Sequence, residues 1–316
     1  MRRSFRIIII GFGSIGQRHY RNLIRLGFKN VYIYDADKNK TKNQKLKIKN
    51  INPQVLEGFS VAFICAPNHL HIKYALMAAK AGCHLFIEKP LSHNFKDINK
   101  LARICEKKES IVLVGCNMRF HPCLRFIKNY LNKGRLGKIY NISHEFGYYL
   151  PFWRVGQDYT KNYAAKKSTG GGIILDDIHE FDLLFWLSSF FKPVKSKFFY
   201  GKISNLKIET EDFCLAYFRF KNNLIGTVKC DYLQKSYTRN CKIVGEKGNL
   251  EWDFKHNVVW LKDEKTAKKL FAIKKFNFNQ TYLNEVKYFF SQIDKKQKTF
   301  NDIKTAFAVL KYCIKR

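Results

Sequence analysis

Short apolar runs alternate with polar and amphipathic segments through the first 115 residues of the chain. The runs are rich in branched residues; they cover 5–10, the residues just before Asp35, 61–65, 84–87 and 111–115. Segments with helical periodicity, among them 71–81 and 95–108, lie between the runs. This alternation predicts a parallel, doubly wound sheet with helices on its faces. Residues 37–52 are polar and lysine-rich, and we expect them to form a shortened connection.

The pattern changes from residue 139 onward, where long apolar and aromatic runs follow one another. These runs predict strands at 140–148, 195–202, 212–220, 224–232 and 238–245. Strands without intervening helices favour an open, mainly antiparallel sheet. A helical stretch at 177–191 follows a triple glycine, and we expect closing helices at 282–292 and 301–314. The patterns therefore predict an α/β domain at 1–119 and an α+β domain at 120–316.

A glycine-rich turn, Gly11-Phe12-Gly13-Ser14-Ile15-Gly16, directly follows the first strand. Gly11 allows a tight turn, Gly13 lets the backbone approach a pyrophosphate, and Gly16 lets the next helix pack closely on the strand. The helix N-terminus, which carries Ser14 and Ile15, presents N–H groups to the phosphates. Strand, turn and helix in this order indicate a dinucleotide-binding Rossmann domain, with contacts from these glycines, Ser14 and Ile15.

Asp35 closes the second apolar run. A carboxylate at the end of the second strand accepts hydrogen bonds from the ribose hydroxyls and repels a 2′-phosphate, so Asp35 favours NAD over NADP. Alternatively, Asp35 is a solvated turn residue, and Lys38 and Lys40 reduce the repulsion. Asp37 is a second candidate for the same role.

Composition limits the class of protein. At 316 residues and 46% hydrophobic content, the chain is long enough for two domains with full cores. Its formal charge of +33 suggests nucleic acid or an anionic membrane as a partner, but the lysines are spread along the whole chain. We therefore expect a lysine-biased surface without specific nucleic-acid or membrane binding. The isoleucine run after Arg6 is too short for a signal peptide or a membrane span. Nine cysteines without metal-ligand spacing predict no metal site and favour a reducing cytoplasm.

Five segments in order resemble the Gfo/Idh/MocA family of NAD(P)-dependent oxidoreductases, and the resemblance covers nearly the whole chain. They are the glycine-rich turn, Cys65-Ala66-Pro67-Asn68-His69-Leu70-His71, Glu88-Lys89-Pro90, Gly115-Cys116-Asn117-Met118-Arg119-Phe120 and Gly170-Gly171-Gly172-Ile173-Ile174-Leu175-Asp176-Asp177-Ile178-His179. The resemblance implies that Ala66-Pro67-Asn68 closes over the dinucleotide and that Lys89 lies beside the nicotinamide. It also implies a homodimer or homotetramer. The cofactor contacts that it implies are Ala66, Pro67, Asn68, His71, Glu88, Lys89 and Asn117.

A lysine at position 89 suits the chemistry that the resemblance implies. Hydride loss from an alcohol carbon leaves a hydroxyl proton, which a positioned side chain must remove. Lys89 follows a strand end, and the carboxyl ends of parallel strands form the ligand crevice of such sheets. We therefore expect Lys89 to be the general acid/base rather than one more solvated lysine, with Glu88 positioning it or the nicotinamide.

A second constellation pairs Asp176 with His179. If a helix begins near Asp176, the spacing places both residues on one face, with Glu180 and close to Asp182. His179 then bonds a substrate hydroxyl and Asp176 fixes its tautomer; alternatively, Asp176 or Asp177 only caps the helix. The family's sugar dehydrogenases usually have one residue more between the two. The shorter form followed by Glu180 resembles a subgroup from surface-polysaccharide and nonulosonic-acid gene clusters.

The loop ahead of the triple glycine carries aromatic and charged residues suited to a sugar. Aromatic faces stack on apolar ring surfaces, and arginine binds a carboxylate or phosphate with two hydrogen bonds. Trp153 alternatively packs on the sheet or against another subunit, and Arg119 alternatively pairs with an acidic residue. The predicted substrate contacts are Arg119, Trp153, Arg154, Asp158, Tyr163, Asp176 and His179.

The leading hypothesis is an NAD-dependent dehydrogenase that moves hydride between nicotinamide and a secondary alcohol of a sugar or nucleotide-sugar derivative. Lys89, Asp176 and His179 are its predicted catalytic residues, and residues 120–316 bind the substrate and form the oligomer contacts. An alternative is NAD-assisted glycoside hydrolysis or epimerisation, in which the cofactor is oxidised and reduced again within one turnover. A third is a non-catalytic dinucleotide-binding or regulatory protein, which would not require the Lys89 and His179 segments.

Overall fold

The computed structural model describes residues 4–153, 156–190 and 192–314. The chain divides into two compact units. Unit 1 comprises Met1–Asn117 and Tyr282–Ile314, and most of unit 2 is Met118–Thr281. Unit 1 contains a five-stranded sheet, and unit 2 contains an eight-stranded sheet. In the described part of the chain, no helix combines the length and apolar character needed to cross a membrane.

Unit 1 contains a wholly parallel sheet with the strand order β2-β1-β3-β4-β5. Its strands are β1 (Ile7–Ile10), β2 (Val31–Tyr34), β3 (Val61–Ile64), β4 (His84–Ile87) and β5 (Val112–Val114). Its helices are α1 (Ser14–Arg25), α2 (Pro53–Leu56), α3 (His71–Lys80), α4 (Ile98–Lys107), α8 (Asn279–Lys295, which begins in unit 2) and α9 (Ile303–Ile314). This arrangement confirms the predicted doubly wound parallel sheet.

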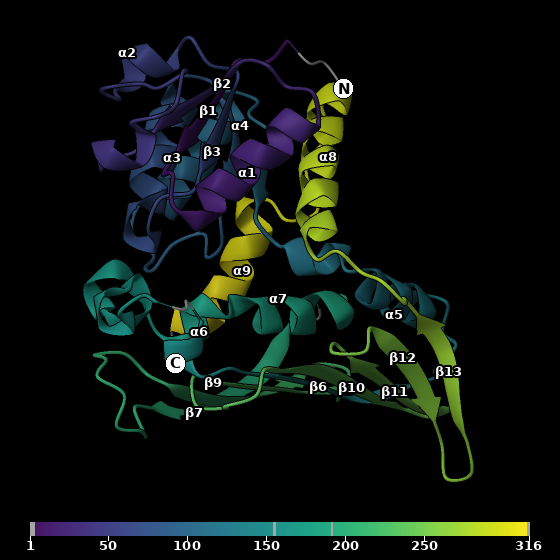
Figure 1. Cartoon of the computed structure of the whole chain (residues 1–316). Coiled ribbons are helices and arrows are strands. Elements are labelled where there is room, and N and C mark those ends of the chain that lie inside the picture. The colour runs from purple at the N-terminus through teal and green to yellow at the C-terminus, as the bar shows by residue number, and fades with distance from the viewer. Residues whose placement is uncertain (1–3, 154–155, 191, 315–316) are drawn as a thin grey trace. The chain divides into compact units, whose positions relative to one another are not determined.

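The core of unit 1 is dominated by aromatic rings from the sheet and from α8. Phe63 of β3 stacks on Phe86 of β4 with ring centroids 4.7 Å apart, and Phe289 of α8 meets both rings edge-on. Leu23 of α1 belongs to the same buried cluster, so α1 and α8 cover one face of the sheet, as Figure 1 also shows. Burying such large apolar side chains is the main favourable term in the stability of this unit.

The C-terminal helices require a correction to the expected domain boundary. Residues 282–314 were assigned with 120–316 to the second domain, but they pack in unit 1. The segment before α9 binds the edge strand β5: Val114 N–H donates to the Asn301 carbonyl at 2.9 Å, and Asn301 Nδ2 donates to the Val114 carbonyl at 2.9 Å. An edge strand has backbone groups that need partners, and this segment satisfies them.

Unit 2 contains an eight-stranded sheet with the order β13-β12-β11-β10-β6-β9-β8-β7. Its strands are β6 (Ile139–Gly147), β7 (Pro193–Gly201), β8 (Phe213–Phe220), β9 (Ile225–Asp231), β10 (Thr238–Gly245), β11 (Gly248–Asp253), β12 (Val258–Lys262) and β13 (Ala267–Ala272). β6 pairs with β9 in parallel, and the other neighbours are antiparallel. The predicted open, mainly antiparallel sheet is confirmed.

Helices cover one face of this sheet. α7 (Ile178–Leu187) packs on β6 and β9, and α5 (Pro122–Asn132) packs on β11, β12 and β13 (Figure 1). The helix expected at 177–191 is shorter than predicted, because Ser189 and Phe190 adopt positive φ angles after α7 ends. A separate short helix, α6 (Ile173–Asp176), precedes it. The 3₁₀ helices are η1 (Lys38–Thr41), η2 (Asn68–Leu70), η3 (Asn117–Phe120), η4 (Leu150–Phe152), η5 (Tyr159–Lys161), η6 (Tyr163–Ala165) and η7 (Lys167–Thr169).

Candidate active site

The glycine-rich turn links β1 to α1, and its glycines differ in how closely other atoms approach them. Gly11 has φ +98°, and a Cβ there would lie 2.6 Å from the backbone of Cys65 and Ala66. A Cβ at Gly16 would lie 2.0 Å from the Gly11 carbonyl oxygen, so the start of α1 packs against the turn only without a side chain. A Cβ at Gly13, in contrast, would meet nothing within 4 Å. The backbone at Gly13 is therefore accessible to a pyrophosphate.

α1 begins at Ser14, followed by Ile15, directly after this opening. The first N–H groups of a helix have no acceptor within the helix, and they favour anions at this position. The open backbone at Gly13 and the helix start fit the phosphates of a dinucleotide.

Asp35 follows β2 and binds the turn directly. Its Oδ2 accepts a hydrogen bond from the Phe12 N–H at 2.6 Å, and its Oδ1 accepts one from the Asp37 N–H at 2.8 Å. Lys40 lies 3.8 Å from Oδ1. Asp37 is more exposed, and its carboxylate caps η1 by accepting from the Asn39 N–H. Of the two candidate acids, Asp35 is thus the one that contacts the glycine-rich turn.

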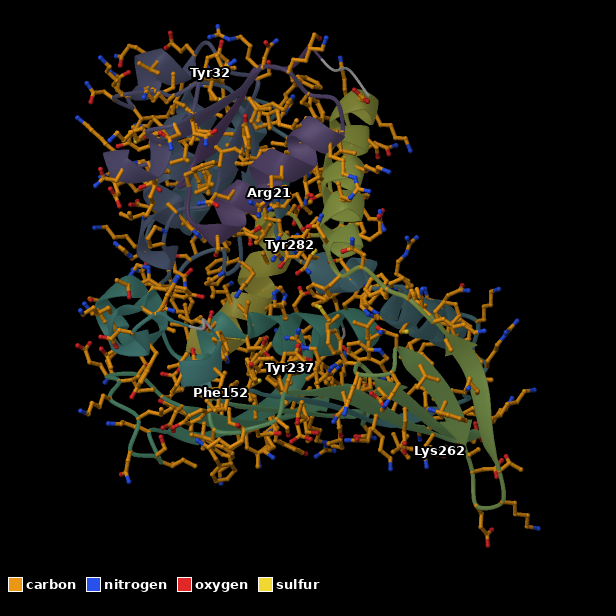
Figure 2. The ribbon with its side chains drawn as sticks, viewed as in Figure 1. Arg21, Tyr32, Phe152, Tyr237, Lys262 and Tyr282 are labelled. Carbon is orange, nitrogen blue, oxygen red and sulfur yellow. The ribbon has the colours of Figure 1, made fainter. Side chains whose placement is uncertain are left out.

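A cavity of about 300 Å³ adjoins the same turn. Arg21 projects from α1 (Figure 2) and contributes to its lining together with Lys40. The full lining consists of Phe12, Gln17, Tyr20, Arg21, Asn39, Lys40, Asn43 and Gln44. Four of these residues come from the short connection after β2, which therefore forms one wall of the cavity.

Glu88 and Lys89 follow β4 at the same carboxyl edge of the sheet. Glu88 is buried, and its Oε1 lies 2.6 Å from Nε2 of His19, a residue of α1 whose side chain is completely buried. Burial raises the pKa of Glu88, but the hydrogen bond and charge of His19, together with the charges of Lys89 and His71, lower it overall. Glu88 therefore stays ionised beside Lys89, which is half-buried.

The other predicted cofactor residues of unit 1 lie in the loops around Lys89. Ala66, Pro67 and Asn68 follow β3 after the intervening residue Cys65; Asn68 is buried, whereas Pro67 is exposed. His71 is buried, and its two ring nitrogens face the carbonyl oxygens of Ala66 and Pro90. Asn117 is buried at the start of η3.

In unit 2, Asp176 is held by two tyrosines. It is the last residue of α6 and is 3% exposed. Its carboxylate accepts hydrogen bonds from the Tyr163 hydroxyl and, at 3.0 Å, from the Tyr232 hydroxyl. Burial and the negative charge of Asp176 raise the pKa of Tyr232, so this phenol remains a donor. The predicted substrate residue Tyr163 and the predicted catalytic residue Asp176 are thus in direct contact.

His179 lies in the first turn of α7 and is half-buried. The prediction of a single helix through Asp176 and His179 is wrong. Asp177 has the non-helical angles φ −109° and ψ 38° and separates α6 from α7. The two residues therefore do not share one helix face by their spacing alone.

The residues around His179 form a buried ionic cluster. Nη2 of Arg239 lies 2.6 Å from Oδ1 of Asp177, and Nε of Arg239 lies 2.8 Å from Oε1 of Glu180. The second oxygen of Glu180 lies 3.1 Å from Nδ1 of His144. This Arg239 cluster, defined as Asp177, Glu180, Arg239 and His144, fixes the start of α7 to β6 and β10.

The remaining predicted substrate residues lie in different surroundings. Arg119 is buried and donates two hydrogen bonds to Asp182, at 2.8 and 2.5 Å. Of the two alternatives for Arg119, the structure therefore shows pairing with an acidic residue. Trp153 donates from Nε1 to the Tyr148 carbonyl at 3.0 Å and packs edge-on against Phe146 and Tyr232. Asp158 is exposed and caps η5. Arg154 lies outside the described residues.

Three residues that hold predicted site residues in place were not predicted from the sequence: His19, Tyr232 and Arg239. His19 carries a weak signal, because it lies three residues after Gly16 on the helix that begins at the glycine-rich turn. Tyr232 and Arg239 lie 56 and 62 residues from the acids that they bind, and only the pairing of the strands brings them together. Among the residues that the structure describes, no group of three His, Cys, Asp or Glu side chains could hold a metal ion.

Both halves of the chain match models of one protein family. Residues 5–116 match the model described as "Oxidoreductase family, NAD-binding Rossmann fold". Residues 124–251 match the model described as "GFO/IDH/MocA C-terminal domain".

Individual relatives agree with these matches. Myo-inositol 2-dehydrogenase of Thermotoga maritima is 25% identical over 309 residues, which cover 91% of this chain and 88% of that protein. The 2,7-anhydro-N-acetylneuraminate hydratase of Mediterraneibacter gnavus is 29% identical over 132 residues, 42% of this chain and 34% of that protein. A solved levoglucosan dehydrogenase in complex with NADH and L-sorbose superposes with a TM-score of 0.83 over 98% of this chain and 95% of that chain, at 17% identity.

Proposed function

Because the chain belongs to the Gfo/Idh/MocA family of oxidoreductases, we propose that it is an NAD-dependent dehydrogenase that oxidises or forms a secondary alcohol of a sugar or nucleotide-sugar derivative. The observation that carries the proposal lies within unit 1. The glycine-rich turn, Asp35 and Lys89 all follow the carboxyl ends of β1, β2 and β4 in one parallel sheet. A dinucleotide binds at that edge in such sheets, so the phosphate-binding turn and a side chain able to move a proton share one edge.

Bound NAD supplies the hydride acceptor at the alcohol carbon. The chain's own task is then to remove the proton from the alcohol oxygen, and Lys89 is the residue proposed for it. Glu88, ionised and fixed by His19, lies next to Lys89 in the chain and holds a negative charge beside the ammonium. Glu88 is thus a fixed, charged neighbour of Lys89 at the end of β4.

In unit 2, we assign the orientation of the substrate hydroxyl to Asp176 and His179. Asp176 is held between two phenol hydroxyls, and the Arg239 cluster fixes the helix that carries His179. Rigid support of this kind keeps a catalytic side chain in one orientation. Among the residues predicted to contact the substrate, Tyr163 supports the assignment of Asp176 best, because its hydroxyl donates to the Asp176 carboxylate.

A second candidate is NAD-assisted chemistry without net oxidation, such as hydrolysis or epimerisation. One relative favours it, since its name describes a hydratase rather than a dehydrogenase. In that case the same residues act on a substrate that is oxidised and reduced again within one turnover. Purified protein that retains NAD and turns over a sugar without net NADH formation would support this candidate.

The test is the absorbance of NADH formed when the protein receives NAD and a panel of inositols, sugars, sugar acids and UDP- or CMP-linked sugars. We expect Lys89→Met to keep cofactor affinity within about threefold and to lose at least about a hundredfold in kcat, because general acid–base catalysis contributes about 10²–10⁴-fold. Lys96→Met, an exposed lysine of the same unit, is the control and should retain activity. A Lys89→Met enzyme with wild-type turnover would remove Lys89 from the mechanism.

The proposal also covers the oligomeric state of the protein and the cellular compartment in which it acts. The face of the sheet opposite α7 exposes Phe199 and Leu215, which are cross-strand partners, and we assign it to contact between copies of the chain in a homo-oligomer. All nine cysteines are buried free thiols, which supports a reducing compartment such as the cytoplasm.

A further inference from the structure

His71 connects two loops of unit 1 through one buried ring. It is the first residue of α3 and is 1% exposed. Its Nδ1 lies 2.7 Å from the carbonyl oxygen of Pro90, and its Nε2 lies 2.8 Å from the carbonyl oxygen of Ala66. Ala66 precedes Asn68 in the loop after β3, and Pro90 follows Lys89 in the loop after β4. The ring therefore links the two loops proposed to contact the dinucleotide.

The chemistry of the two contacts sets a condition on the ring. A carbonyl oxygen only accepts hydrogen bonds, so each contact needs an N–H on the histidine. A neutral imidazole has one N–H and an imidazolium has two. Both contacts are therefore hydrogen bonds only when His71 is protonated; in the neutral ring, one bare nitrogen faces a carbonyl oxygen at close range.

Some groups around His71 disfavour its protonated form, and others stabilise it. Burial lowers its pKa and Lys89 acts in the same direction, whereas the two carbonyls and the ionised Glu88 raise it; the net effect is a lowered pKa. Glu88 is itself bound by His19 from α1. A ligand that favours the doubly bonded state therefore adds to the groups that already stabilise the protonated ring, namely the two carbonyls and Glu88.

We propose that His71 is a positioning residue that joins the loops after β3 and β4 by taking up a proton when the dinucleotide binds. The inference rests on the proposed function in one respect, namely that these two loops contact the cofactor. His71 acts on the cofactor through the backbone of Ala66 and Pro90. A bound dinucleotide needs both loops in place, and the protonated ring holds both.

Linkage fixes the direction of the pH dependence. If the cofactor-bound state favours the protonated ring, cofactor binding raises the pKa of His71 and takes up a proton from solution. Affinity for the dinucleotide then increases as the pH falls through the pKa of the bound state towards that of the free state. The opposite dependence would follow if the neutral ring were the binding form.

The experiment is calorimetric titration of the full chain with NADH in pairs of buffers that differ in ionisation enthalpy, at about pH 6, 7 and 8. For the wild type we expect proton uptake of up to about one per NADH. His71→Gln keeps a donor for one carbonyl, and we expect about tenfold weaker binding at pH 6, because a charge-assisted hydrogen bond is lost. Its affinity should be independent of pH, with no proton uptake.

The matched control is His84→Gln. His84 lies at the start of β4 in the same unit, burial also lowers its pKa, and its Nδ1 accepts from the Ile111 N–H at 3.0 Å. Its replacement should leave NADH affinity and proton uptake at wild-type values. A purely structural role for His71 would instead lower the thermal stability of His71→Gln and leave the proton uptake of that variant at the wild-type value.

Two outcomes separate this inference from the proposed function. Failure of the wild type to bind NADH at all would contradict the proposed function. NADH binding without proton uptake in the wild type, or with unchanged uptake in His71→Gln, would overturn the role of His71 alone. The wild-type measurement needs no variant, so poor folding of His71→Gln would not prevent the test.

Discussion

A single carboxylate at Asp35 has two functions at the end of β2. It binds the backbone of Phe12 and so fixes the glycine-rich turn, and in the proposed function its charge also meets the adenosine ribose of the dinucleotide. Lys40 approaches it at 3.8 Å and is half-exposed, so screening by solvent limits what this pair contributes. The structure therefore favours Asp35 over Asp37 as the residue that discriminates NAD from NADP.

We predict that Asp35→Asn shifts cofactor preference towards NADP. The amide keeps an oxygen to accept from the Phe12 N–H but removes the charge that repels a 2′-phosphate, so the ratio of the Kd for NADPH to the Kd for NADH should fall at least about tenfold. Fluorescence titration with NADH and NADPH measures the ratio. Asp37→Asn is the control; an equal shift in that variant would assign the discrimination to Asp37.

At the scale of elements, α7 depends on a buried ionic cluster. Arg239 of β10 binds Asp177 and Glu180 at the start of the helix, and Glu180 also contacts His144 of β6. Burying these charges is tolerable only because they are paired. The cluster thus fixes the helix that carries His179 to the two central strands of the sheet.

We predict that Arg239→Met destabilises the protein by about 3–5 kcal/mol, because the buried carboxylates of Asp177 and Glu180 lose this cation and Glu180 keeps only its contact with His144. Chemical denaturation followed by circular dichroism measures the change. Lys229→Met, which breaks the more exposed pair with Glu145, should cost no more than about 1 kcal/mol. Equal losses in the two variants would show that the Arg239 cluster does not hold unit 2 together.

For the whole molecule, the sequence predicted unit 1 more completely than unit 2. The strands β1, β3 and β5 of unit 1 are short apolar runs with both faces buried, which the apolar pattern identifies directly. β11, β12 and β13 were missed; β13 reads Ala-Lys-Lys-Leu-Phe-Ala and shows no alternation, because it is largely exposed at the sheet edge. No element was predicted between residues 120 and 139, so α5 was missed as well.

The site was predictable only where its residues follow one another in sequence. The glycine-rich turn, Asp35 and Glu88-Lys89 are local motifs, and each lies at the end of a strand as predicted. Tyr232 and Arg239 gain their roles from strand pairing across long sequence separations, which no local pattern reveals. Arg119 shows the reverse case, since a residue beside a motif pairs with Asp182 inside unit 2.

The exposed face of the eight-stranded sheet provides the last prediction. Phe199 of β7 is 54% exposed, and its cross-strand partner Leu215 is exposed beside it, whereas the central strands carry the ion pair between Lys229 and Glu145 on the same face. A highly charged chain repels its copies, so association requires that such apolar surface be buried. If the proposed homo-oligomer forms through this face, Phe199→Asp should give a smaller species than the wild type in light scattering after size exclusion. Ile24→Asp, an exposed apolar position on α1, should leave the mass unchanged; a wild-type mass for Phe199→Asp would place the contact elsewhere.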